Sequence, residues 1–161
     1  MTRLRVGAGV ALWLSLAVVG AAGAVACADA PENSPGPAAS DGVFTNDDIA
    51  VMDAILAQAF EEHAHNLQVE GRGTVVRVLA DDEDGSRHQR FVLRLGSGQT
   101  LLIAHNIDLA PRINSLRVRD TVAFYGEYEW NEEGGTIHWT HIDPDGEHVA
   151  GWLRHRNRVY R

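Results

Sequence analysis

The chain has 161 residues, 45% of them hydrophobic and 22% charged, which is an ordinary composition for one globular domain. Its 22 acidic residues outnumber its 14 basic residues, so the formal net charge is −8. This acidic balance argues against a dedicated nucleic-acid binder, because phosphate contacts need a basic surface. Cys27 is the single cysteine of the chain, so a disulfide within the chain is excluded.

Residues 1–27 have the pattern of a secretory signal peptide. Arg3 and Arg5 precede a long apolar stretch, and small residues lead up to Cys27. The sequence Ala-Val-Ala-Cys that ends at Cys27 resembles the lipobox of bacterial lipoproteins, whose cysteine is lipidated and becomes the new N-terminus. We therefore expect export to the periplasm or outer cell envelope, with a lipid anchor in the membrane at Cys27. Ordinary signal-peptidase cleavage and a retained apolar anchor are the alternatives.

Residues 28–42 are rich in Pro, Ala, Ser and Gly, which is typical of a flexible tether. Residues 43–161 are expected to form a single domain that begins with one amphipathic helix near residues 46–65. Thr45 and Asp48 match a capping box at the start of this helix, and the apolar residues that follow recur at helical spacing.

Beyond Gly71 the apolar residues alternate with polar ones, which predicts strands. Five short strands are expected, at residues 74–79, 88–95, 100–105, 120–130 and 136–141. Polar or glycine-rich turns separate them, and a longer connection lies between the third and the fourth. This count and spacing predict a mostly β fold, a small five-stranded OB-like barrel preceded by the helix. Another small barrel or a β-sandwich is the alternative.

Histidines and acids of the predicted barrel are the candidates for a metal site. Neutral imidazoles and carboxylates are ligands that zinc and similar divalent metals accept. No HExxH or HxH spacing occurs, and His138 and His141 should face opposite sides of one strand unless a bulge intervenes. At most one of these two is therefore expected in a given site. The candidate metal ligands are His88, His105, Asp108, His138, His141 and Asp143.

Several blocks between Gly85 and Tyr160 resemble a bacterial family of uncharacterised exported proteins known as domain of unknown function 3465. The blocks are Gly85–Phe91, Leu102–Pro111, Tyr125–Asn131, Gly134–His141 and Gly151–Trp152. The resemblance implies no particular activity. It does draw attention to polar groups within the blocks that a barrel does not need for packing, namely His88, His105, Asn106, Asp108, His138 and His141.

The favoured hypothesis is an envelope binding module for a small molecule, a glycan or a protein. OB-like domains bind their ligands on the face around strands two and three, and no catalytic constellation is evident in the sequence. The candidate binding residues are His88, Arg90, Arg94, His105, Asn106, Asp108, His138, Trp139 and His141. The alternative is a metal-dependent hydrolase, in which a metal held by the histidines and acids activates water. An anchored scaffold for an envelope complex is a third interpretation.

Overall fold

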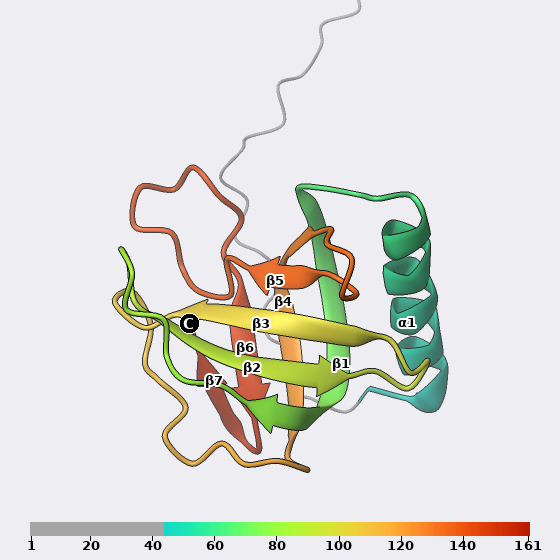
Figure 1. Cartoon of the computed structure of the whole chain (residues 1–161), viewed down its shortest axis with the longest axis horizontal. Coiled ribbons are helices and arrows are strands. Elements are labelled where there is room, and N and C mark those ends of the chain that lie inside the picture. Colours follow the sequence, from blue (N-terminus) through green and yellow to red (C-terminus); the bar gives the residue numbers. More distant parts are fainter. Residues whose placement is uncertain (1–43) are drawn as a thin grey trace, which may run out of the picture.

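The computed structural model describes residues 44–161, where it contains one helix and seven strands (Figure 1). The predicted signal peptide and tether lie outside the described residues. The elements are α1 (Asn46–Glu61), β1 (Leu67–Val78), β2 (His88–Arg94), β3 (Thr100–Asn106), β4 (Thr121–Glu129), β5 (Thr136–His138), β6 (Trp152–His155) and β7 (Arg158–Tyr160). No helix among residues 44–161 is long and apolar enough to cross a membrane.

Helix α1 begins at the predicted capping box. The Thr45 hydroxyl accepts a hydrogen bond from the Asp48 backbone N–H (3.2 Å), and the Asp48 carboxylate accepts one from the Thr45 N–H (2.9 Å). Leu56 is fully buried against the barrel. The carboxylate of Asp53 accepts the backbone N–H of Ser97 in the β2–β3 turn (2.7 Å), which fixes the helix beside that end of the barrel.

Strands β1 to β5 close into a barrel in the order β1-β2-β3-β5-β4, and β4 pairs back onto β1. All pairings in the barrel are antiparallel except that between β3 and β5. This is the predicted five-stranded OB-like barrel. Two further strands, β6 and β7, form a hairpin that extends the sheet beside β4, and these were not among the five expected strands.

The largest difference from the predicted elements is in β1, which begins at Leu67, seven residues before the expected start. Gly71 and Gly73 obscure the alternation there, but they belong to the strand. A Cβ atom at Gly71 would lie 2.4 Å from the ring of Phe124 on the paired strand, so glycine leaves room for this core side chain. Further along β1 the pairing with β2 shifts between Val75 and Arg77, which marks a β-bulge.

The barrel is filled by the inward-facing side chains of all five strands. Phe91, Ile103, Phe124 and Ile137 are fully buried there, and Leu153 of the added hairpin is as well. Because side chains alternate along each strand, the neighbours of these residues in sequence face outward. The outward-facing side chains of β1, β2, β3 and β5 form the candidate site.

Candidate functional site

The outer face of β5, β3, β2 and β1 carries most of the predicted binding residues, and we call it the ligand face. The strand register aligns its residues in rows. Val92 lies opposite Leu102 and beside Arg77, and Arg90 lies opposite Ala104. The ligand face consists of Arg77, His88, Arg90, Val92, Arg94, Thr100, Leu102, Ala104, Asn106, Thr136 and His138.

One end of the ligand face is hollowed where three histidines come together. This histidine hollow has a volume of about 170 Å³. Its lining is His88, Ala104, Asn106, Leu109, His138, Trp139 and His141. Five of the predicted binding residues therefore line one concavity, although they come from β2, β3, β5 and the segment that follows β5.

The expectation that His138 and His141 would face opposite sides is wrong. Strand β5 ends at His138, and the next residue, Trp139, adopts a φ of 49°. This left-handed conformation turns the chain out of the strand, so the alternation of side chains stops. A Cβ atom at Gly151 would lie 1.9 Å from the carbonyl oxygen of Trp139, so the returning chain packs tightly against this turn. Both histidines consequently line the same hollow.

Hydrogen bonds to backbone carbonyls orient two of the three imidazoles. The Nδ1 atom of His88 lies 2.7 Å from the carbonyl oxygen of Ser86, and Nδ1 of His141 lies 2.9 Å from that of Ile142. A carbonyl only accepts, so each Nδ1 carries a proton, and in the uncharged form of each ring Nε2 is an acceptor. Burial, with the nearby imidazole of His88, lowers the pKa of His138, which favours the uncharged ring.

His105 is outside the hollow because it points into the barrel. Its side chain is completely buried, and both ring nitrogens have partners. Nδ1 lies 2.8 Å from the Thr140 hydroxyl, and Nε2 lies 3.3 Å from the carbonyl oxygen of Pro111. Burial lowers the pKa of His105 to about 4, so the ring is neutral at physiological pH. This histidine ties β3 to the two segments that enclose it.

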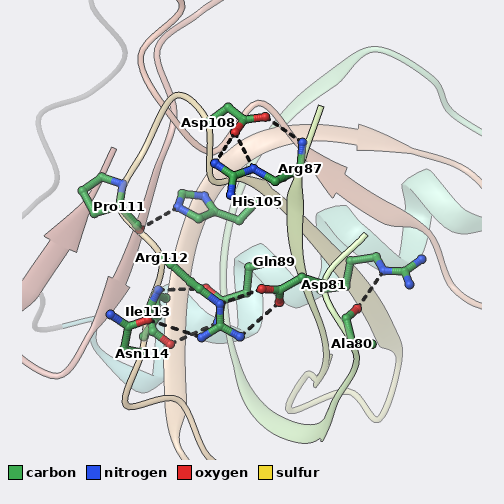
Figure 2. Close-up of polar contacts among 11 residues, drawn as sticks. Ala80, Asp81, Arg87, Gln89, His105, Asp108, Pro111, Arg112, Ile113 and Asn114 are labelled. Atoms are coloured by element: carbon green, nitrogen blue, oxygen red, sulfur yellow. Dashed lines mark hydrogen bonds and ion pairs between the residues drawn. The ribbon is translucent and has the colours of Figure 1, made fainter. Parts of the chain in front are cut away.

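Asp108 and Asp143 hold loops in place. The carboxylate of Asp108 accepts hydrogen bonds from the backbone N–H and the guanidinium of Arg87, both at 2.8 Å (Figure 2). The carboxylate of Asp143 accepts backbone N–H groups from Asp145, Glu147 and His148. Neither residue lines the histidine hollow.

The connection between β3 and β4 is fixed to the β1–β2 region by further polar contacts (Figure 2). The Gln89 side chain accepts from the Ile113 N–H (2.8 Å) and donates to the Ile113 carbonyl (3.0 Å). Arg112 donates to both oxygens of Asp81 (2.8 and 3.1 Å). These contacts attach the β3–β4 connection to β2 and to the segment that follows β1.

The other end of the ligand face carries a larger hollow of about 440 Å³, which we call the arginine hollow. Its lining is Val76, Arg77, Leu79, Val92, Arg94, Thr100, Leu101, Leu102, Asn131, Glu133 and Gly135. Strands β1, β2 and β3 form its floor, and the β4–β5 loop forms its rim. Of the predicted binding residues, this hollow contains Arg94 alone.

Arg77 was missed because the bulge in β1 interrupts the alternation that would have placed it on this face. The arginines of the ligand face differ in their partners. Arg90 donates to the carbonyl of Ala80 and pairs with Asp82 at 3.3 Å. Arg77 and Arg94 form no ion pair with any residue in the range 44–161. Both guanidinium groups are thus available for a ligand.

The six predicted metal ligands separate in the structure. His88, His138 and His141 meet in the histidine hollow, whereas His105 lies in the barrel interior and the two acids hold loops. In the part of the chain that the structure describes, no group of three or more His, Cys, Asp or Glu side chains is arranged to hold a metal ion. The metal-dependent hydrolase therefore stays a prediction from the sequence.

Comparison with known proteins supports the resemblance found in the sequence. A comparison with curated proteins finds no match for the chain. A family model described as "Protein of unknown function (DUF3465)" matches residues 41–161, which include the helix, the whole barrel and the added hairpin. The match covers well over half of the chain, and the chain therefore belongs to this family.

Proposed function

We propose that this protein is an exported lipoprotein whose OB-like domain binds an extended, acidic ligand across the ligand face. The observation that carries the proposal is the arginine hollow. Arg77 and Arg94, which form no ion pair with residues 44–161, lie there beside the apolar side chains of Val92 and Leu102. A site with a few placed cations among apolar groups is suited to hold a ligand that has carboxylate or phosphate groups.

The position of the arginine hollow supports this proposal. OB domains bind ligands on the face of strands two and three, between the loops that follow strands one and four. The arginine hollow is lined by those strands and by Asn131 and Glu133 of the β4–β5 loop. Agreement of fold position with local chemistry is stronger support than the fold alone, because one fold serves many functions.

The negative charge of the chain also favours a short acidic ligand over a nucleic acid. With Arg3 and Arg5 of the predicted signal peptide removed, the formal charge falls from −8 to about −10. Long-range repulsion from such a protein weakens binding to a polyanion, while a short acidic ligand interacts mainly with the local guanidinium groups. Glu133 at the rim of the hollow adds selectivity for ligands that place few negative charges there.

Replacing both available arginines tests the binding site. We expect Arg77→Gln/Arg94→Gln in the full chain to weaken binding of an acidic oligosaccharide on the order of 30-fold, through loss of charge-assisted hydrogen bonds. The matched control, Arg156→Gln/Arg158→Gln, changes the net charge equally on the β6–β7 hairpin, outside the arginine hollow. Calorimetry that finds equal losses for the two variants would show that net charge, and not this site, governs binding.

The export part of the proposal rests on Cys27 and the residues before it. Cells fed with a fatty-acid probe should label the full chain, and Cys27→Ser should abolish the label. A label that survives this substitution, or an unlabelled wild-type protein, would contradict the lipid anchor. Binding by the ligand face is independent of that result.

A further inference from the structure

The histidine hollow identifies a second subsite on the ligand face, and its size limits what it can hold. Its volume of about 170 Å³ is below the roughly 300 Å³ at which pockets for whole drug-sized ligands begin. It is therefore suited to one ring-sized part of a longer ligand. Because it shares its face with the arginine hollow, a ligand of several units would occupy both.

The subsite offers hydrogen-bond acceptors whose identity is set by the surrounding backbone. In their uncharged form, the rings of His88 and His141 donate from Nδ1 to the carbonyls of Ser86 and Ile142 and have Nε2 as an acceptor. The surrounding backbone thus determines which ring nitrogen accepts. A ligand group that donates a hydrogen bond, such as a hydroxyl, complements these atoms.

Donors and apolar surface complete the lining. The Asn106 side-chain oxygen accepts the backbone N–H groups of Asp108 (2.9 Å) and Leu109 (3.3 Å), so its NH₂ group is left as a donor. Ala104, Leu109 and Trp139 supply the apolar part of the lining, and the Trp139 indole is itself stacked on the ring of His148, with 3.6 Å between the ring centroids. In the described part of the chain, no carboxylate and no arginine lines this hollow. Donors and acceptors beside apolar side chains match a sugar ring, whose hydroxyls both donate and accept and whose C–H groups pack on apolar surface.

The strand pairing of the ligand face disfavours an extended peptide as the ligand. A peptide that adds to a sheet needs an unpaired strand edge. Strand β2 is paired on both sides, with β1 and β3, and β3 is paired on both sides, with β2 and β5. The ligand face therefore offers side chains and hollows without a free backbone ladder.

We propose that the ligand is an acidic oligosaccharide, bound with an uncharged sugar ring in the histidine hollow and a sugar carboxylate at Arg77 and Arg94. Ala104 and Thr100, which line the two hollows, are four residues apart on β3 and so roughly 13 Å apart along the strand. The ligand must therefore be longer than one ring. This inference rests on the proposed function and specifies its ligand class.

Three matched probes test this inference by calorimetry with the full chain. The first is a hyaluronan tetrasaccharide, which alternates glucuronic acid with N-acetylglucosamine. The second is the same tetrasaccharide with its carboxyl groups reduced to alcohols, and the third is a tetraglutamate peptide. We expect the first to bind most tightly, and each of the others to bind at least about tenfold more weakly, because each lacks one of the two interactions.

Two variants examine the histidine hollow itself. His88→Phe removes one fixed acceptor and should weaken binding of the acidic tetrasaccharide about fivefold. Ala104→Leu fills the hollow without removing a hydrogen bond. It should weaken binding of the acidic tetrasaccharide about tenfold or more. His65→Phe is the control, because neither His65 nor its partner Glu129 lines the hollow. Thermal unfolding of each variant verifies that it is folded.

The outcomes separate the inference from the proposed function. Tetraglutamate that binds as tightly as the acidic tetrasaccharide, or unchanged affinity in both folded hollow variants, would overturn the sugar assignment. The proposed function would still stand if Arg77→Gln/Arg94→Gln abolished that binding. If none of the acidic probes binds the folded wild-type chain, the proposed function is overturned together with the inference.

Discussion

The histidine of β3 and those of the histidine hollow belong to the same barrel, yet their environments differ. His105 is fully buried, and both of its ring nitrogens contact protein atoms. His88 is partly exposed, and among residues 44–161 its ring has a hydrogen-bond partner at Nδ1 alone. A histidine whose nitrogens are all satisfied inside the core stabilises the fold, whereas one with a nitrogen directed to a hollow can bind a ligand. The substitutions below test this difference, starting with the largest expected effect.

Truncation of the buried histidine should cost the most stability. His105→Ala leaves a cavity and removes the partners of Thr140 and of the Pro111 carbonyl. We expect the free energy of unfolding to fall by about 3 kcal/mol, measured by chemical denaturation. A loss below about 1 kcal/mol, the range of ordinary surface substitutions, would show that His105 does not have the structural role assigned to it.

The same residue should make stability depend on pH. The pKa of His105 is about 4 in the folded protein against a usual 6.5, so the unfolded chain binds the proton more readily. Its contribution to stability is therefore complete above pH 6.5 and is lost as the pH falls toward about 4. The loss should approach about 3 kcal/mol. Denaturation at a series of pH values measures it.

A variant without the imidazole is the control for this pH dependence. His105→Gln should flatten the dependence between pH 6.5 and about 4. The lowered pKa of His138 acts in the same direction, so a smaller slope should persist in the variant. An unchanged slope would assign the effect to other groups.

The turn at Trp139 should be sensitive to Gly151. A Cβ atom at Gly151 would lie 1.9 Å from the Trp139 carbonyl oxygen and 2.5 Å from that of Tyr125, and backbone atoms cannot yield easily. Gly151→Ala should lower the free energy of unfolding by about 2 kcal/mol and displace Trp139. Gly85→Ala is a useful comparison, because its Cβ would meet no atom within 4 Å although its φ is 74°. Equal losses in both variants would indicate that contact with Trp139 is unimportant.

The smallest stability change is expected for a histidine of the hollow. His138→Ala removes a partly exposed ring whose nitrogens have no hydrogen-bond partner in the range 44–161, and should change the free energy of unfolding by less than about 0.5 kcal/mol. Its effect should appear in the binding of the acidic tetrasaccharide instead. A stability loss comparable with that of His105→Ala would remove the distinction between the two kinds of histidine.

Much of the fold was predictable because local signals agreed with the barrel. The Thr45–Asp48 capping box places the start of α1, and strict alternation places β2 and β3 to within one residue. The beginning of β1 was not predictable in the same way. Gly71 has a low strand propensity. The reason for a glycine at this position is the ring of Phe124, which packs against it and is distant in sequence.

The candidate site was predictable in its residue types but only partly in its geometry. The alternation on β3 places His105 on the same side as Leu101 and Ile103, so its burial could have been inferred from the sequence. The convergence of His138 and His141 could not, because the left-handed conformation of Trp139 carries no clear signal in the sequence. The outward position of Arg77 could not be predicted either, because the β-bulge between Val75 and Arg77 interrupts the alternation of side chains.

The central claim is that the ligand face binds an acidic oligosaccharide, and NMR mapping on the full chain tests it most directly. On titration with the hyaluronan tetrasaccharide, the account predicts the largest chemical-shift changes at Arg77, Leu102 and Ala104 and at the Trp139 indole. The β6–β7 hairpin should be unaffected. Changes confined to that hairpin or to α1, or no change at any residue, would contradict the claim.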